Sequence, residues 1–356
     1  MPSGRPACSR LNFKGNPVAS SIESPKKPTL RTISELSGLA VPTVSRALND
    51  APDIGKDTKA RVREIAREIG YVPNRAGVRL RTGKTNVISL VLGTDNEVTD
   101  HTGQLVSSIA RELRDTRYHM IVTPYFPDED PMIPVRYIVE TASADAVILN
   151  RVEVDDPRIA YLMERNFPFV CYGRSKWRDR HPYFDFDNET FGQIAARGLL
   201  ARGCRAITIL APPEVQNYAQ DMIRGARDTL AGSGASFEVL TGISGDDPGE
   251  VIQTRIAEYL QAHPDRDGLI CPSTTAAIAA VVGAERIGRQ IGTDLQVFAK
   301  EATPFLGYFR APIGTARENV REAGSYLARA AIQAIERPDL PPMQKLVSAT
   351  ASDTVG

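Results

Sequence analysis

Three side chains that can contact nucleic acid lie within four residues of one another, namely Thr43, Ser45 and Arg46. Small hydroxyl groups can contact phosphate oxygens, and an arginine can donate two hydrogen bonds to the acceptors of one guanine. A short helix that directs these groups outward would therefore be suited to the major groove of DNA.

The surrounding residues predict helices that would hold these groups in place. A first helix can begin after the N-cap Thr29 and end at Gly38, whose permissive backbone suits a helix terminus. Pro42 suits the first turn of a second helix, and a third helix is predicted over residues 56–69. The inward side chains recur at helical spacing: Leu30, Ile33, Leu36, Ser37, Val44, Ala47, Leu48, Val62, Ile65, Ala66 and Ile69. Because helix pairs around a glycine also occur as ordinary packing, this pattern alone leaves both interpretations open.

The charge distribution favours the nucleic-acid interpretation. Residues 28–84 contain 11 Lys and Arg against 6 Asp and Glu, and residues 1–27 contain 5 against 1. The whole chain is balanced, with 43 charges of each sign, so residues 85–356 carry an excess of nine negative charges. A basic front is thus joined to an acidic body, and the basic front suits a phosphate-bearing partner.

Two motifs give the chain a resemblance to a known family. TVSRALN at residues 43–49 is followed by GYVPN at residues 70–74 and by a predicted strand, which resembles the headpiece and hinge of the LacI family of bacterial transcriptional regulators. The resemblance implies a DNA interface made by Thr29, Val41, Pro42, Thr43, Ser45, Arg46, Asn49, Tyr71, Asn74, Arg75 and Leu80. Val41 and Pro42 would touch thymine methyl groups or only pack.

The headpiece departs from the usual family sequence at four positions. Thr32, Ser34, Ser37 and Ala40 stand where the family usually has Asp, Ala, Ala and Ser. We expect weaker caps on both helices, because acidic and hydroxyl side chains are the better partners for free N–H groups at a helix start. Every apolar core position is retained.

Residues 74–84 match the family's hinge between headpiece and core. A segment this short is marginal as an isolated helix, so it needs a partner to fold against. The resemblance implies that two hinges pair across a dimer axis and that Leu80 enters the minor groove as a wedge, whereas a plain linker would leave Leu80 without that role. Gly77, where alanine is common, costs about 1 kcal/mol of helix propensity, so we expect a hinge that melts easily.

Composition excludes several classes of protein. The 356 residues are 42% hydrophobic, which suits more than one globular core, and no apolar run has membrane-spanning length. Residues 1–27 are rich in Pro, Ser, Gly and Lys and lack the apolar stretch of a signal peptide, so we expect a disordered extension and a cytoplasmic protein. No disulfide, metal or cofactor is expected, because the histidines show no metal spacing and these cysteines lie far apart: Cys8, Cys171, Cys204 and Cys271.

From residue 86 onward, predicted strands alternate with amphipathic helices, which indicates parallel sheets covered on both faces. The eight predicted strands are residues 87–92, 119–123, 145–150, 169–172, 205–210, 237–240, 268–271 and 295–299. No G-x-G-x-x-G or Walker motif follows a strand. The predicted fold class is α/β, with a small all-α helix-turn-helix headpiece and a doubly wound ligand-binding core. The resemblance implies two subdomains in that core, as in periplasmic binding proteins.

The resemblance also implies a division of the chain. The headpiece would span residues 28–73, the hinge 74–84 and the effector-binding core 85–347, with crossovers between the subdomains near Asp187 and Glu318. Residues 348–356 would form a tail. This tail lacks the heptad leucines of a coiled coil that would make tetramers, so we expect a homodimer.

Ligands of open parallel sheets bind beyond the carboxyl ends of the strands, where this chain has polar residues. By family motif, the effector pocket would be lined by Asn150, Arg174, Asp187, Asn188, Asn217, Tyr218, Ser273 and Glu301. The alternative for each of them is to cap the next helix. Gly173, Met222 and the run at 299–302 replace residues that the family usually conserves as Asp, Arg and a glycine-aromatic-Asp-Asp sequence, which indicates a rebuilt pocket.

Neutral amides, hydroxyls and both signs of charge suit a sugar, whose apolar faces could stack on aromatic rings of Trp177, Tyr183, Phe184 or Tyr218. We therefore predict a sequence-specific regulator, a repressor that binds a near-palindromic DNA operator under the control of a small carbohydrate, as in regulators of glucoside use. The alternatives are a sugar-binding protein without a role on DNA and a regulator co-repressed by a non-sugar metabolite. No catalysis is expected, because His181, Asp187 and Glu301 form no specific motif.

Overall fold

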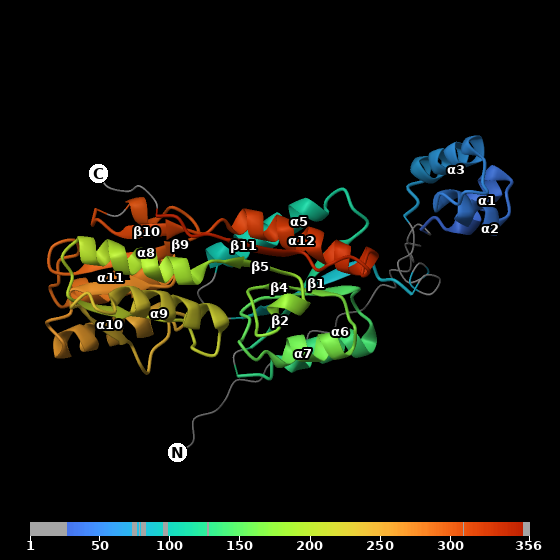
Figure 1. Ribbon diagram of the computed structural model, residues 1–356. Coiled ribbons are helices and arrows are strands. Elements are labelled where there is room, and N and C mark those ends of the chain that lie inside the picture. Colours follow the sequence, from blue (N-terminus) through green and yellow to red (C-terminus); the bar gives the residue numbers. More distant parts are fainter. Residues whose placement is uncertain are drawn as a thin grey trace, which may run out of the picture. The chain divides into compact units, whose positions relative to one another are not determined.

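The computed structural model describes residues 27–72, 77, 79, 83–94, 99–126, 128–308 and 310–351. The chain forms two compact units that divide between Gly83 and Lys84 (Figure 1). Three residues of the predicted DNA interface, Asn74, Arg75 and Leu80, lie outside the described residues, as do residues 1–26 of the predicted extension and 352–356 of the predicted tail.

The first unit consists of three short helices, as its apolar spacing predicts. They are α1 Leu30–Ser37, α2 Val41–Leu48 and α3 Lys56–Glu68. Each helix contributes a fully buried side chain to a common core, namely Ile33, Val44 and Val62. Leu36 is predicted to face inward but is 55% exposed, because the buried stripe of α1 runs through Ile33 and Ser37.

The two helices around Gly38 differ in how they are capped. Thr29 and Thr32 form a reciprocal capping box, in which the hydroxyl of each residue accepts a hydrogen bond from the other's N–H. The prediction of a weak cap is therefore wrong for α1, because threonine serves where the family usually has aspartate. It is confirmed for α2, whose N-cap Ala40 makes no side-chain cap. Gly38 ends α1 in the left-handed region, with φ 73°.

The second unit is built on two parallel β-sheets. The strands are β1 Val87–Gly93, β2 His119–Tyr125, β3 Ala146–Leu149, β4 Phe169–Tyr172, β5 Tyr183–Phe186, β6 Ala206–Ile209, β7 Ser236–Val239, β8 Gly268–Cys271, β9 Gln296–Glu301, β10 Gly314–Arg317 and β11 Gln344–Val347. The first sheet has the order β11-β5-β4-β3-β1-β2 and the second β10-β9-β8-β6-β7. The predicted α/β architecture is confirmed.

Three of these strands, β5, β10 and β11, are absent from the sequence prediction. β10 and β11 lie at sheet edges, and alternate residues of β11 are exposed, so neither strand carries a continuous apolar run. β5 interrupts its aromatic residues with Asp185, which is buried. A strand of this kind lacks the uniform hydrophobicity by which buried parallel strands are recognised.

Eight helices among the described residues cover both faces of the two sheets (Figure 1). They are α5 Thr99–Leu113, α6 Met132–Thr141, α7 Pro157–Glu164, α8 Asn188–Ala201, α9 Asn217–Leu230, α10 Gly249–Ala262, α11 Thr274–Arg286 and α12 Val320–Glu336. On the first sheet, α5 and α12 share one core and α6 and α7 another. On the second sheet, α8 and α9 cover one face and α10 and α11 the other. No described helix has both the length and the apolar character needed to cross a membrane.

The chain passes between the two sheets three times. It leaves the first sheet after Phe186, at the end of β5, and returns after Arg317, at the end of β10. It crosses again after β11, because Ala349 is buried in the core of the second sheet and Ala351 forms a bridge with Ala316. Residues 348–351, assigned to a tail by the sequence prediction, thus belong to the second subdomain.

Candidate functional site

The face of α2 carries most of the predicted DNA contacts that the structure describes. Val41, Pro42, Arg46 and Asn49 are exposed, whereas Thr43 and Ser45 are half-buried. Thr29 is exposed at the start of α1 and also serves as its cap. Tyr71 packs against the core of the three helices, and its N–H donates to the carbonyl of Ala66 at 2.8 Å.

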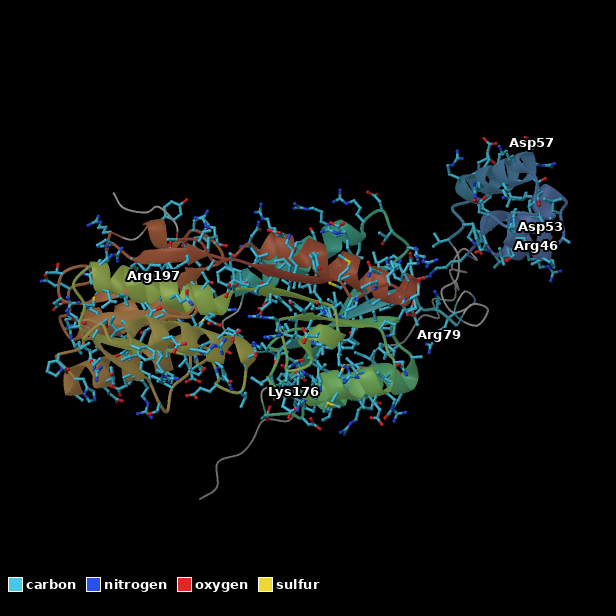
Figure 2. The ribbon with its side chains drawn as sticks, in the orientation of Figure 1. Arg46, Asp53, Asp57, Arg79, Lys176 and Arg197 are labelled. Atoms are coloured by element: carbon cyan, nitrogen blue, oxygen red, sulfur yellow. The ribbon has the colours of Figure 1, made fainter. Side chains whose placement is uncertain are left out.

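Arg46 forms an ion pair with Asp53, in the loop between α2 and α3 (Figure 2). Asp50 lies in the left-handed region at the end of α2, where Lys59 and Arg63 reach its carboxylate at 3.1 and 2.9 Å. Hydrogen bonds from these two cations lower the pKa of Asp50. A nucleic acid that bound Arg46 would have to replace Asp53 as its partner, a feature that the helix pattern does not reveal.

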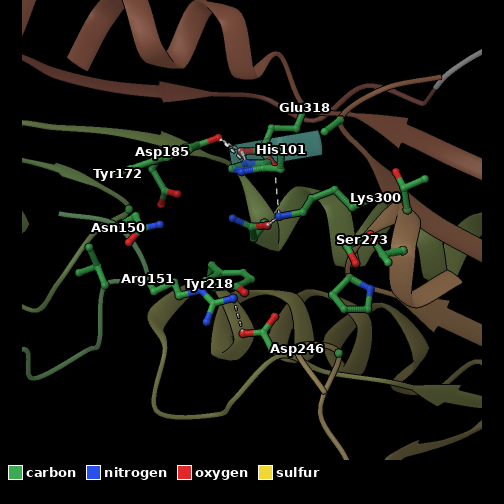
Figure 3. Close-up of a pocket in the computed structure, with 18 of the residues that line it drawn as sticks. His101, Asn150, Arg151, Tyr172, Asp185, Tyr218, Asp246, Ser273, Lys300 and Glu318 are labelled. Atoms are coloured by element: carbon green, nitrogen blue, oxygen red, sulfur yellow. Dashed lines mark hydrogen bonds and ion pairs between the residues drawn. The ribbon is translucent and has the colours of Figure 1, made fainter. Parts of the chain in front are cut away.

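A cavity lies between the two sheets of the second unit, beyond the carboxyl ends of their strands (Figure 3). Its space, including the open mouth, is about 1190 Å³. The lining residues come from both subdomains: His101, Asn150, Arg151, Val152, Tyr172, Gly173, Arg174, Asp185, Asn188, Tyr218, Gly245, Asp246, Pro272, Ser273, Thr274, Thr275, Lys300, Ala302 and Glu318.

Five of the eight predicted effector residues line this cavity: Asn150, Arg174, Asn188, Tyr218 and Ser273. Ser273 also caps α11 by accepting from the N–H of Ala276. The other three do not line the cavity and have structural partners. Asp187 caps α8 by accepting from Thr190, the side chain of Asn217 donates to Asp221 at 3.0 Å, and buried Glu301 accepts from the N–H of Leu306 at 2.9 Å.

Only one of the four aromatic side chains predicted to stack on a sugar lines the cavity among the described residues. Tyr218 lines the cavity, where its ring lies beneath the ammonium group of Lys300. Phe184 is buried in the core of the first sheet, and Trp177 and Tyr183 pack against the core beneath α6 and α7. The cavity instead gains Tyr172, whose ring stacks on His101 with their centroids 5.6 Å apart.

Lys300 and Glu318 form a nearly buried ion pair at the edge of the cavity. Their charged atoms lie 3.2 Å apart, and Nζ of Lys300 is also 3.2 Å from Oδ1 of Asn188. The carboxylate of Glu318 accepts from the hydroxyl of Tyr172, and His101 lies 4.0 Å away. Burial opposes ionisation of Glu318, but Lys300, His101 and Tyr172 outweigh it and hold the pKa of Glu318 well below its usual range.

Arg174 links the two subdomains through a pair of buried carboxylates. Its Nε donates to Asp185 at 2.6 Å, and its Nη2 donates to Asp221 of α9 at 2.9 Å. Burial raises the pKa of Asp185 to about 7, although Arg174 acts in the opposite direction. The side chains of both aspartates are at most 6% exposed, so the arginine is fixed between them.

A second set of contacts joins the loop after β3 to the segments after β6 and β7 across the cavity. Arg151 and Asp246 form an ion pair at 3.5 Å, visible in Figure 3. Glu153 pairs with Gln216 in an antiparallel bridge. The N–H of Asn217 donates to the carbonyl of Val152 at 2.9 Å. These contacts hold the subdomains close together around the cavity.

Three residues that line the cavity each carry a buried side-chain oxygen with no hydrogen-bond partner in the part of the chain that the structure describes. These oxygens are Oδ1 of Asn150, Oδ2 of Asp246 and Oγ1 of Thr274. Leaving a polar atom buried and unpaired is costly, so a ligand that reached and bonded the oxygens of Asn150 and Thr274 would gain affinity. Within the described residues, no cluster of His, Cys, Asp and Glu is arranged to bind a metal.

Two segments of the chain match known protein families. Residues 29–74 match the family of bacterial regulatory proteins called lacI, and residues 196–352 match the periplasmic binding protein-like domain. The HTH-type transcriptional regulator AglR of Rhizobium meliloti is 33% identical to the chain over 328 residues, which cover 89% of this chain and 90% of AglR. The chain belongs to the LacI family.

Other LacI-family proteins share the sequence or the fold. The HTH-type transcriptional regulator RafR of Escherichia coli is 34% identical over 237 residues, covering 65% of this chain and 67% of RafR. A CelR–cellobiose complex has a TM-score of 0.66 at 22% identity, covering 92% of this chain and 98% of CelR. The lac repressor dimer bound to operator has a TM-score of 0.77 at 19% identity, with the same coverage. The headpiece motifs therefore identify a helix-turn-helix transcriptional regulator.

Proposed function

We propose that this LacI-family regulator is a repressor whose operator binding is controlled by a small neutral carbohydrate in the cavity between the two sheets. The observation that carries the proposal is the pairing of charges around the cavity. Arg151, Arg174 and Lys300 each have an acidic partner, whereas Asn150 and Thr274 carry buried oxygens without a hydrogen-bond partner among the described residues.

The pattern of paired and unpaired groups favours a polyhydroxylated ligand over an anion. A carboxylate or phosphate ligand would need to displace an existing acidic partner from a cation, which costs the interactions already made. A hydroxyl group can donate to the amide oxygen of Asn150 and exchange a hydrogen bond with Thr274 without disturbing any ion pair. The ring of Tyr218 offers an apolar face nearby.

The comparisons support the same ligand class. CelR is complexed with cellobiose in a structure that resembles this chain over 92% of its length. The ligand of the present chain is then a neutral sugar of related chemistry. His181, Asp187 and Glu301 would not make the chain an enzyme: His181 is buried against Phe169, and the other two hold backbone N–H groups.

We further propose that the regulator acts as a homodimer whose headpieces, residues 28–73, are joined to the core by a hinge at residues 74–84. Exposed apolar side chains on the edge strand β2 and on neighbouring α6 support a second copy as the occupant of this sheet edge. They are Ile121, Val122, Ile133 and Tyr137, each at least 40% exposed. Exposed apolar side chains along one edge favour a partner over solvent.

A two-step experiment tests the proposal. The full chain is first used to select duplexes from a random DNA library, and release of the selected duplex is then measured across neutral mono-, di- and trisaccharides, with cellobiose included. At least one sugar should weaken binding to this selected duplex and leave binding to a scrambled duplex unchanged. Release by none of the sugars, or tighter binding caused by a non-sugar metabolite, would favour a co-repressed regulator. Failure to select any duplex would favour a sugar-binding protein without a role on DNA.

A further inference from the structure

The second unit begins with residues that are held by one carboxylate. Asp145 lies immediately before β3, and its Oδ1 accepts from both the N–H and the hydroxyl of Thr85 at 2.8 Å. Its Oδ2 accepts from the N–H of Asn86, also at 2.8 Å. Asn86 is in the left-handed region, with φ 54°, and its carbonyl accepts from His119 at 2.8 Å. The chain is thus fixed at the first residues that follow Lys84.

The strand that follows this carboxylate leads directly to the cavity. All four residues of β3, Ala146–Leu149, are fully buried, and β3 pairs with β1 on one side and β4 on the other. Asn150 and Arg151 come next and line the cavity. Arg158, itself buried by pairing with Asp156, donates to the carbonyls of both residues at 3.1 and 3.0 Å.

We propose that Asp145 is the positioning residue through which the cavity controls the linker at residues 74–84. The short strand β3 is one extended element of roughly 13 Å between Asp145 and Asn150, so a shift at Asn150 is carried along the strand to Asp145. Three hydrogen bonds to a charged acceptor make Thr85 and Asn86 follow Asp145. The inference rests on the proposed function, because it assigns a route for the response to the sugar.

The second subdomain contains a natural control for this arrangement. Asp267 lies immediately before β8, and its carboxylate accepts from the N–H of Arg205 and of Ala206, at distances of 2.8 to 3.0 Å. Arg205 precedes the strand β6 and Ala206 begins it, much as Thr85 and Asn86 precede β1. Asp145 and Asp267 therefore make the same kind of structural clamp, but only Asp145 holds residues that adjoin the linker.

The experiment compares Asp145→Ala with Asp267→Ala in the full chain, using the selected duplex, a scrambled duplex and the panel sugar that gives the largest release. For Asp145→Ala we expect the Kd for the operator to rise about tenfold, which corresponds to the energy of roughly one charge-assisted hydrogen bond. The sugar-induced release should fall toward onefold, which means that the sugar no longer changes operator binding. Sugar binding and scrambled-duplex binding should stay within about twofold, because neither depends on the clamp. Asp267→Ala should leave operator affinity and release unchanged.

Thr85→Ala keeps the test decisive if Asp145→Ala does not fold. It removes a half-buried hydroxyl, which donates to Asp145 and accepts from the N–H of Val87, and it keeps both N–H bonds to Asp145. Thr85→Ala should also reduce the sugar-induced release, by a smaller factor than Asp145→Ala does. Equal effects of the Asp145 and Asp267 variants would show that the clamp only stabilises the fold and would overturn the inference, as would unchanged release in both Asp145→Ala and Thr85→Ala. Failure of the proposed function is distinct, since the parent chain itself would then show no release.

Discussion

Replacing Lys300 by methionine tests the electrostatics of the cavity through folding stability. The substitution keeps much of the aliphatic stem but removes the cation that lies 3.2 Å from Glu318. The carboxylate of Glu318 would remain buried, with only 5% of its side chain exposed, and would keep Tyr172 and His101 as partners. Lys300→Met therefore isolates the contribution of the ammonium group.

The expected loss of unfolding free energy follows from the burial of the ion pair. Removing one partner of a buried ion pair costs about 3–5 kcal/mol, because the other charge is left uncompensated. The remaining hydrogen bond from Tyr172 and the nearby His101 offset part of this cost, so we expect a loss of about 2–4 kcal/mol in unfolding free energy at pH 7.5. In the double variant Lys300→Met/Glu318→Gln no buried charge is left without a partner, so most of the lost unfolding free energy should be recovered.

The pH dependence shows whether the ionised carboxylate of Glu318 stabilises or destabilises the fold. In the parent chain the pKa of Glu318 is held below its usual range, so its stabilisation is present above the unfolded pKa and is lost as the pH falls. In Lys300→Met, burial prevails and the pKa of Glu318 rises, so the ionised carboxylate destabilises the fold at pH 7.5 and less so at pH 5. The free-energy difference between parent and variant should therefore shrink as the pH falls from 7.5 to 5.

Urea unfolding followed by tryptophan fluorescence measures these differences. The chain has one tryptophan, Trp177, which lies in the second unit, so its signal reports on the unit that contains the ion pair. A loss below about 1 kcal/mol, or a loss that is the same at both pH values, would refute the account of Glu318 as a buried charge neutralised by Lys300. A double variant as unstable as the single one would refute it as well.

Three further predictions concern the DNA face and the packing of the core. Arg46→Ala should weaken binding to the selected duplex by about 1–3 kcal/mol and relax the sequence preference of the protein, as measured by repeating the selection. Loss of a phosphate contact alone would leave that preference intact. Leu80→Ala should weaken the selected duplex and reduce its bending in a gel-shift assay, an effect that a plain linker residue would not show. Gly225→Ala should lower unfolding free energy by about 1–3 kcal/mol, since a Cβ there would lie 2.0 Å from the carbonyl of Glu189, and Gly103 of α5, with no atom within 4 Å of such a Cβ, serves as the comparison site in the urea assay.

The helices of the first unit were predictable because their packing is local. Ile33, Val44 and Val62 each belong to an apolar stripe with helical spacing, and their three helices pack on one another. The ion pair between Arg46 and Asp53 was not predictable, because it depends on the path of the loop between α2 and α3. Side-chain periodicity carries no information about that path.

The cavity was partly predictable for a related reason. Asn150 and Ser273 follow buried strands that the sequence identifies, and the rule that ligands bind at strand ends places them correctly at the cavity. Glu301 was predicted to line the cavity, but Lys300 lines it, because β9 continues two residues past its predicted end and neighbouring side chains alternate between faces. Asp185 was missed with its strand.

Under the proposed function, one small carbohydrate and the operator bind the same chain in opposition. Because coupling is reciprocal, the sugar must lose affinity for the operator-bound chain by the same factor by which it weakens the operator. The decisive measurement is the Kd of the releasing sugar, determined by calorimetry for the free chain and for the chain saturated with the selected duplex. We predict weaker binding to the complex, by a factor equal to the measured release. Equal affinity for the two forms would contradict the account.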